Sequence, residues 1–197
     1  MACSTVHKTL YLLRHGSTGL SGKFIGSTDI PISQDGAAEI HRSAGFLVAM
    51  GIQKVFCSPM LRCRQTAQLL SLPCTIEYKS SLQEIDFGAW EKKSFQEICG
   101  EGQSLIDVWI SDYAQFGFPG GESIQQFLNR LSSFLKFLPT VPESSVLLIT
   151  HGGVIRHLLC LLLEIPVTKY LSFDVKTGRY CSLEMYETGA VLTGFNL

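Results

Sequence analysis

Two histidine-glycine pairs are the residues of this chain best suited to catalysis. Arg14-His15-Gly16 directly follows the apolar run 10–13, and His151-Gly152 follows the run 146–150. Apolar runs of this length predict buried strands, and open α/β sheets bind ligands beyond the carboxyl ends of such strands. We therefore expect both imidazoles and the guanidinium of Arg14 to meet at one edge of a sheet.

These residue types suit phosphoryl transfer. An imidazole has an unperturbed pKa of about 6.5, so it can act as an unprotonated nucleophile near neutral pH. Arg14 and Arg62 offer forked, permanently charged donors that match phosphate oxygens, and His151 adds a donor when it is protonated. Gly152 opens a predicted helix whose N-terminal amides favour an anion. The pattern predicts covalent catalysis on a phosphate ester.

The sequence around these residues alternates between strand and helix patterns, which favours a parallel sheet covered on both faces. Strands are predicted at residues 9–13, 55–57, 75–78, 146–150, 181–186 and 190–195, and helices at residues 37–50, 58–70, 123–138 and 154–163. Residues 95–113 are predicted to be helical only in part. We expect a three-layer α/β sandwich with a mostly parallel central sheet, formed by residues 1–197 as a single domain.

Local signals place several element ends. Ser58-Pro59 has the form of an N-cap followed by a first-turn proline, and residues 123–126 read Ser-Ile-Gln-Gln, the form of a capping box. Gly51 is expected to end the helix before it, and Thr188-Gly189 to connect two late strands as a hairpin.

Composition excludes several classes of protein. The chain has 197 residues, of which 46% are hydrophobic and 17% charged, and a formal net charge of −1, so neither disorder nor a nucleic-acid surface is expected. No signal peptide is read at the N-terminus, and the longest apolar stretch, 158–163, is far shorter than a membrane span. Seven scattered cysteines, Cys3 among them, without a Cys-x-x-Cys pair argue against a disulfide framework or a zinc site and favour the cytoplasm.

Taken in order, five motifs resemble those of the histidine phosphatase superfamily, the family that includes phosphoglycerate mutases and small phosphatases. The resemblance covers nearly the whole chain. The motifs are Leu-Arg-His-Gly-Ser-Thr at 13–18, the segment 22–33, the segment 57–67 around Arg62, the segment 82–91 around Glu84, and Thr-His-Gly-Gly at 150–153.

The resemblance implies a role for each matched residue. His15 is expected to be the nucleophile that becomes phosphohistidine, while Arg14, Arg62 and His151 hold the transferring phosphoryl group. Glu84 is expected to protonate the leaving oxygen and then to act as base for the attacking water. The reaction is expected to need no metal and no other cofactor, because the arginines neutralise the phosphate.

The chain departs from the family pattern in its first loop. Ser17 stands where an acidic residue is common, and the loop lacks a frequent asparagine, for which Ser21 is a candidate substitute. Lys23 stands where the family often has arginine, which keeps the charge but loses the bidentate fork. Lys23, Ser21, Gly26 and Gly152 are the further candidates for contact with the substrate phosphate.

Alternatives remain for some of these residues. Arg64 competes with Arg62 as the phosphate ligand, and Asp86 lies two residues from Glu84. His157 fits a structural role within an apolar helix. Arg130 and Arg156 fit solvated charges, as does Lys23.

Within the superfamily, the chain is most similar to the small phosphatases that act on α-ribazole-5′-phosphate in cobalamin synthesis. The similarity lies in its length, in segments 87–91 and 119–123, and in the C-terminal strands. It implies a small-molecule phosphate monoester as partner and an aromatic wall for the leaving group, with the candidates Phe87, Trp90, Trp109, Tyr113, Phe116 and Phe118. A broad-range sugar- or glycerate-phosphate phosphatase, a phosphoglycerate mutase and an inactive phospho-ligand sensor stay open as alternatives. A homodimer is also compatible with the sequence.

Overall fold

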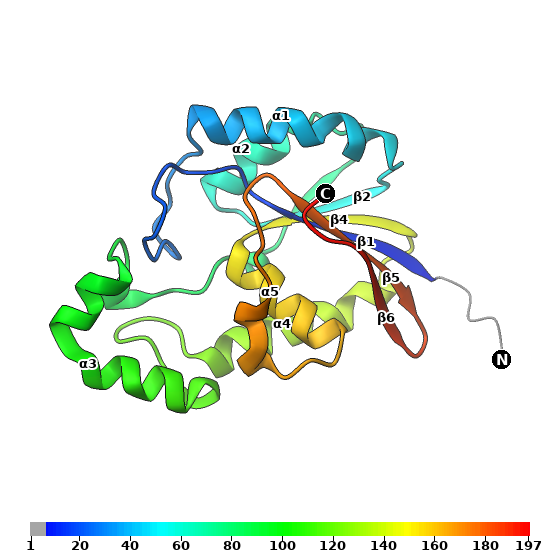
Figure 1. Cartoon of the computed structure of the whole chain (residues 1–197). Coiled ribbons are helices and arrows are strands. Elements are labelled where there is room, and N and C mark those ends of the chain that lie inside the picture. Colours follow the sequence, from blue (N-terminus) through cyan, green and yellow to red (C-terminus); the bar gives the residue numbers. More distant parts are fainter. Residues whose placement is uncertain (1–6) are drawn as a thin grey trace.

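A mixed β-sheet forms the centre of the protein, whose computed structural model describes residues 7–197 (Figure 1). Its described strands are β1 (Lys8–Arg14), β2 (Lys54–Cys57), β3 (Ile76–Tyr78), β4 (Ser145–Thr150), β5 (Tyr180–Tyr186) and β6 (Gly189–Gly194), in the spatial order β3-β2-β4-β1-β5-β6. The four strands from β3 to β1 are parallel to one another, and β5 is antiparallel to its neighbours β1 and β6. The expected mostly parallel sheet is confirmed.

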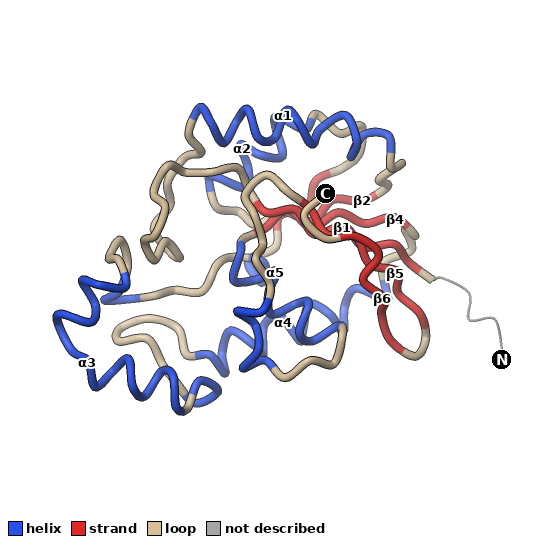
Figure 2. Tube along the Cα trace, viewed as in Figure 1, coloured by secondary structure: helices blue, strands red, loops and turns tan. Residues whose placement is uncertain are grey.

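Different helices cover the two faces of the sheet (Figures 1 and 2). Helices α1 (Gln34–Ala49) and α2 (Leu61–Leu70) cover one face, and α4 (Ile124–Phe137) and α5 (Gly152–Leu162) cover the other. Successive residues of β1 therefore enter different cores: Leu10 and Leu12 pack with α4 and α5, whereas Tyr11 and Leu13 pack with α1 and α2. Burial on both faces explains the continuous apolar strands, and the three layers are confirmed.

Helix α3 (Phe95–Ser111) is continuous, where the sequence predicted a helix only in part. Ser94 accepts a hydrogen bond from the amide of Glu97, whose carboxylate accepts one from the amide of Ser94, so a capping box begins the helix. Ile98 and Ile106 are buried in the same hydrophobic core cluster as residues of α4 and α5. The helix extends to the side of the three layers (Figure 2).

Most local signals are confirmed. Ser123 and Gln126 form the expected capping box of α4, Gly51 has a φ of +63° after α1, and β5 and β6 form the hairpin. The expected start of α2 at Ser58 is wrong, because the helix begins at Leu61 and its first amide donates to Oδ1 of Asp29 at 2.6 Å. A carboxylate brought by a distant loop thus replaces the local cap.

Six of the cysteines lie within the described residues and all of them are free thiols. Cys57, Cys160 and Cys181 are buried as small core side chains, as expected. Cys3 and most of the N-terminal segment lie outside the described residues. Over the described part of the chain, no helix is both long enough and apolar enough to span a membrane.

Candidate active site

The two histidines meet where β1 and β4 end. Arg14 is the last residue of β1 and pairs in register with Thr150, the last residue of β4, so His15 and His151 follow side by side. Their ring centroids are 5.1 Å apart. The parallel pairing of two buried strands thus places both imidazoles at one point, as the sequence predicted.

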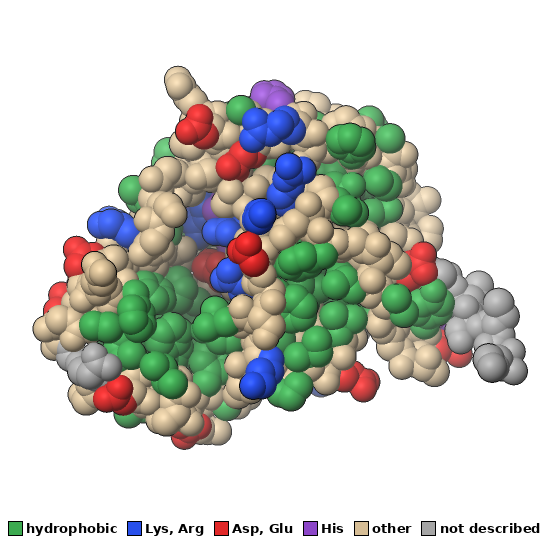
Figure 3. All heavy atoms as spheres, viewed as in Figure 1, with side chains coloured by type: hydrophobic (Ala, Val, Ile, Leu, Met, Phe, Trp, Pro, Cys, Tyr) green, Lys and Arg blue, Asp and Glu red, His purple; other side chains and the backbone are tan. Residues whose placement is uncertain are grey.

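A cavity of about 400 Å³ opens at this point. Figure 3 shows this face of the molecule hollowed, with basic side chains inside the hollow and above it and hydrophobic side chains below it. The lining includes the basic side chains of Arg14, Arg62 and Arg156, and the carboxylate of Glu84. The cavity therefore combines charges for an anion with an apolar side for the rest of a ligand.

His15 is held in one orientation and one tautomer. Its Nδ1 lies 2.8 Å from the carbonyl oxygen of Gly16, which can only accept, so Nδ1 carries the proton and Nε2 has a free lone pair. Burial lowers the pKa of His15 to about 3, and the charges of Arg14 and Arg62 contribute. The side chain is thus a neutral imidazole at physiological pH, which is the reactive form of a nucleophile.

Arg62 is anchored deep in the site, with 1% of its surface exposed. Its Nη1 donates to the carbonyl of Thr28 at 2.9 Å, its Nη2 to that of Gly26 at 2.8 Å, and its Nε to Nδ1 of His151 at 3.1 Å. These bonds use three of its five N–H groups, so two remain for a ligand. Arg62 lines the cavity and Arg64 does not. Their positions therefore favour Arg62 as the phosphate ligand.

His151 supports Arg62 from behind. Because its Nδ1 accepts from Arg62, its Nε2 carries the proton and donates to the hydroxyl of Ser58 at 2.8 Å. Burial and the charge of Arg62 hold the pKa of His151 well below its usual value. The side chain is completely buried and is not among those lining the cavity. In this arrangement it has no free N–H for the phosphate and instead orients Arg62.

Arg14 reaches the cavity across the start of α5. Its Nη1 donates to the carbonyl of Val175 at 2.7 Å, while its buried Nε has no hydrogen-bond partner. A Cβ on Gly152 would lie 3.2 Å from the guanidinium, so the glycine lets Arg14 pass closely. Gly152 therefore makes room for Arg14, whose Nε is enclosed and has no hydrogen-bond partner among the residues that the structure describes.

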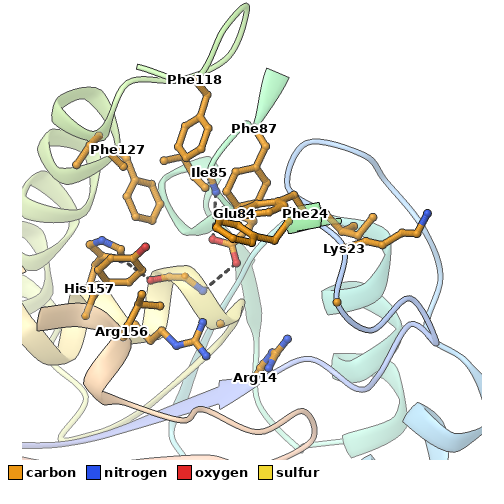
Figure 4. Close-up of a pocket in the computed structure, with 18 of the residues that line it drawn as sticks. Arg14, Lys23, Phe24, Glu84, Ile85, Phe87, Phe118, Phe127, Arg156 and His157 are labelled. Carbon is orange, nitrogen blue, oxygen red and sulfur yellow. Dashed lines mark hydrogen bonds between the residues drawn. The ribbon is translucent and has the colours of Figure 1, made fainter. Parts of the chain in front are cut away.

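Glu84 occupies the N-terminus of α5. Its carboxylate accepts from the amide of Gly153 at 2.9 Å and from its neighbour Ile85 at 3.1 Å. A Cβ on Gly153 would lie 2.4 Å from Oε1 of Glu84, so a side chain at this position would displace the carboxylate. An amide at the start of this helix, where the sequence predicted an anion, thus binds the carboxylate of Glu84, which lines the cavity (Figure 4).

Arg130 fixes the loop that carries Glu84. Its guanidinium donates to the carbonyls of Ser81, Gln83 and Glu84 and forms an ion pair with Glu122, with an N–O distance of 2.8 Å. It is therefore a structural clamp between α4 and this loop rather than a solvated charge. Asp86 accepts from Ser27 and from the amide of Gly88, and it does not line the cavity.

The other candidate phosphate contacts are less central. Lys23 lines the cavity, but its ammonium group points away from Arg14 and Arg156 in Figure 4. Ser21 lines only an adjacent cavity, which also contains Arg42, Lys176 and Arg179. Gly26 lines neither cavity, since its carbonyl accepts from Arg62 and its amide donates to Glu91.

Sequence reasoning missed a group of residues on the side of α5. Arg156 lines the cavity and donates from Nε to the carbonyl of Phe173 at 2.8 Å. His157 also lines it, with Nδ1 on the carbonyl of Gly153 at 2.7 Å and Nε2 accepting from the hydroxyl of Tyr113 at 2.6 Å. Residues three and four positions after Gly153 share a helix face with it, and this spacing is the signal that could have found them.

Aromatic side chains form the opposite wall. Phe24 and Phe87 have ring centroids 5.0 Å apart, as do Phe87 and Phe118, all in edge-to-face packing (Figure 4). Of the predicted wall residues, Phe87, Trp109, Tyr113 and Phe118 line the cavity, whereas Trp90 and Phe116 are buried behind it. No group of three or more His, Cys, Asp or Glu side chains among the described residues is placed to hold a metal ion.

The fold and this site together are those of an enzyme acting on phosphate esters. The chain belongs to the histidine phosphatase superfamily (branch 1), whose family model matches residues 10–197, and it is a phosphatase. An adenosylcobalamin/α-ribazole phosphatase from Salmonella typhimurium is 27% identical over 194 residues, which cover 95% of this chain and 95% of that protein.

Solved structures agree with this assignment. The α-ribazole phosphatase from Shigella flexneri is 26% identical, with a TM-score of 0.85 over 96% of each chain. A further structure, from Escherichia coli, has a TM-score of 0.89 over 96% of each chain at 24% identity, which supports the fold alone.

Proposed function

We propose that the protein hydrolyses phosphate monoesters through a phosphohistidine at Nε2 of His15. The observation that carries the proposal is the hydrogen bond from Nδ1 to the carbonyl of Gly16, which leaves Nε2 unprotonated in a cavity that Arg14 and Arg62 also line. A neutral, oriented imidazole needs no further activation to attack phosphorus. Arg14 and Arg62 offset the negative charge that otherwise repels a nucleophile.

The reaction has two displacements. In the first, Nε2 of His15 bonds to phosphorus, the ester P–O bond breaks, and Glu84 gives its proton to the leaving oxygen. In the second, a water oxygen bonds to phosphorus, its proton passes to Glu84, and the N–P bond breaks to release inorganic phosphate and neutral His15. The position of Glu84 supports both proton transfers, because its carboxyl group lines the same cavity as His15 and is held by the amide of Gly153.

For the substrate, we infer a phosphate ester whose leaving alcohol carries a planar, largely apolar ring. The specific candidate is α-ribazole-5′-phosphate. Two observations support it: the aromatic wall beside Glu84, and the names of the relatives from Salmonella and Shigella. The test is kcat/KM for α-ribazole-5′-phosphate against 3-phosphoglycerate and fructose phosphates. A preference of about a hundredfold, or about 2.7 kcal/mol, is expected. Equal values would exclude a dedicated pocket and leave a broad-range phosphatase.

Turnover itself separates an enzyme from a binding protein. We expect the purified protein to hydrolyse p-nitrophenyl phosphate in the presence of a chelator. Binding of inorganic phosphate without turnover would instead identify a sensor. The cytoplasmic location and the homodimer stay predictions from the sequence, to be checked by cell fractionation and by sedimentation.

A further inference from the structure

A loop formed by residues 173–179 crosses the active site. It joins the 3₁₀ turn Val167–Ser172 to β5 and is the orange segment that runs past the end of β1 in Figure 1. The amide of Gly178 donates to the carbonyls of Arg14 and His15, at 3.1 and 3.2 Å, and the hydroxyl of Ser43 donates to the carbonyl of Gly178 at 2.6 Å. The 173–179 loop is thus bonded to the backbone of the nucleophile and to α1.

Two carbonyls of this loop hold two arginines from different elements. The carbonyl of Val175 accepts from Nη1 of Arg14 at 2.7 Å, and the carbonyl of Phe173 accepts from Nε of Arg156 at 2.8 Å. Arg14 ends β1 and Arg156 lies one turn into α5, yet both line the cavity, and their guanidinium groups lie on the same side of it, below Glu84 in Figure 4. Because the two accepting residues are only two positions apart, the loop sets the spacing of the pair.

Arg14 and Arg156 are close enough for their positive charges to interact. Burial lowers the pKa of Arg14 and the charge of Arg156 lowers it further, while the carboxylates of Glu84, Glu39 and Asp174 act in the opposite direction. Nε of Arg14 is buried without a partner, and within the described residues the Nη groups of Arg156 form no hydrogen bond to protein. Two forked cations with unused donors, held together at one side of a cavity, are the arrangement that binds phosphate oxygens.

Asn196 anchors the loop on both sides of Val175. Its Nδ2 donates to the carbonyl of Asp174 at 2.7 Å, and its Oδ1 accepts from the amide of Lys176 at 3.0 Å. Asn196 itself has a φ of +54°, a conformation that asparagine tolerates better than most residues. Its side chain is therefore in place to fix the carbonyls that hold the two arginines, although it does not line the cavity.

We propose that Arg156 binds the substrate phosphoryl group together with Arg14, and that Asn196 is a positioning residue that keeps the pair aligned through the 173–179 loop. The proposal rests on the phosphatase function proposed above. Because one loop holds both arginines, Arg156 can contact the same anion as Arg14. Arg14 immediately precedes the nucleophile His15 in the chain, so that anion is the phosphoryl group. The opposite wall of the cavity is aromatic and fits an apolar leaving group. Such a leaving group carries no second anion, so the phosphoryl group is the anion that Arg156 binds.

The experiment measures inhibition by inorganic phosphate with p-nitrophenyl phosphate as substrate. We expect Arg156→Gln to raise the inhibition constant for phosphate about tenfold, which corresponds to about 1.4 kcal/mol. Arg156→Lys should recover only part of the loss, because an ammonium lacks the fork. Asn196→Ala should raise the constant about threefold, whereas the control Asn129→Ala, an exposed asparagine of α4 bonded to Gln125, should leave it unchanged.

The double variant distinguishes positioning from general destabilisation. If Asn196 acts through Arg156, its substitution should matter less in the Arg156→Gln background, and the combined effect should fall below the product of the two. An unchanged phosphate constant in Arg156→Gln, with slower turnover only for esters that have an anionic leaving group, would overturn the proposal. So would a fully multiplicative double variant. Absence of turnover in the unmodified protein would instead contradict the proposed function.

Discussion

At the residue scale, the site separates two acid-base roles by hydrogen bonding. The Nδ1–H of His15 donates a hydrogen bond to the carbonyl of Gly16 and the ring stays neutral, so Nε2 can attack phosphorus. The carboxylate of Glu84 accepts hydrogen bonds from the amides of Ile85 and Gly153 and lines the same cavity as His15. Both side chains are thus held in place by backbone groups before a substrate binds, which limits the reorganisation that catalysis requires.

Replacement of Glu84 tests its role as proton donor. Glu84→Gln keeps the amide contacts but cannot deliver a proton, so we expect a loss of about 10²–10⁴ in kcat for alkyl phosphates. The loss should be much smaller for p-nitrophenyl phosphate, whose leaving group needs little protonation. Rates for the two substrates are compared under identical conditions, and equal losses would remove Glu84 from this role.

Gly153 provides a second test of the same carboxylate. In Gly153→Ala the added Cβ meets Oε1 of Glu84, so the carboxylate is displaced and turnover of alkyl phosphates should fall at least tenfold. The matched control is Gly45→Ala in α1, where a Cβ meets nothing within 4 Å. It should keep full activity and stabilise the protein by about 0.4–1 kcal/mol. Full activity in Gly153→Ala would show that the acid does not depend on this contact.

At the scale of elements, the chain shows which parts of the fold can be predicted locally. The apolar runs of β1 and β4, the capping box of α4 and the turn of the late hairpin depend on neighbouring residues, and each was predicted from them. The start of α2 depends on Asp29, which only the folded chain brings to Leu61. The local N-cap pattern at Ser58 therefore predicted the wrong start of the helix, since the hydroxyl of Ser58 forms a hydrogen bond with His151.

The same limit applies to the site. His15 and His151 were found because each directly follows a strand that the sequence marks clearly. Arg156 and Arg130 looked like solvated charges, because the carbonyls that hold them lie in loops distant along the chain. A charged side chain is recognised as part of a site only when its partners are known.

Arg130 is the element-scale prediction. It joins α4 to three carbonyls of the loop that carries Glu84, so Arg130→Met should lower the free energy of unfolding by roughly 2–3 kcal/mol and also lower kcat. Urea denaturation gives the first quantity and steady-state kinetics the second. The exposed Lys136 of α4 offers a control, Lys136→Met, which should change neither. If Arg130→Met kept both the free energy of unfolding and the kcat of the unmodified protein, Arg130 would not be a clamp.

At the scale of the whole molecule, buried neutral histidines link stability to pH. Burial lowers the pKa of His15 to about 3 and that of His157 to about 4, and it holds the pKa of His151 well below its usual range. In the unfolded chain a histidine has a pKa of about 6.5. Between these values the unfolded state binds more protons than the folded state, so stability is present above pH 6.5 and is lost as the pH falls.

This linkage can be measured directly. From pH 6.5 down to about pH 4, each of these histidines should lower the free energy of unfolding by up to about 1.4 kcal/mol per pH unit. Urea denaturation at several pH values gives the slope of the free energy of unfolding against pH. His157→Gln should reduce this slope by the amount that corresponds to about one bound proton. A free energy of unfolding that stays constant over this range would show that the histidines are protonated in the folded state.

The central claim is that His15 carries the phosphoryl group, and the most direct measurement is to quench the enzyme during turnover and locate the bound phosphate. We predict one phosphoryl group per chain on Nε2 of His15, labile in acid and stable in base, and absent from His15→Ala. That variant should still bind inorganic phosphate through its arginines. Turnover at the wild-type rate in His15→Ala, or a phosphoryl group on another residue, would contradict the account.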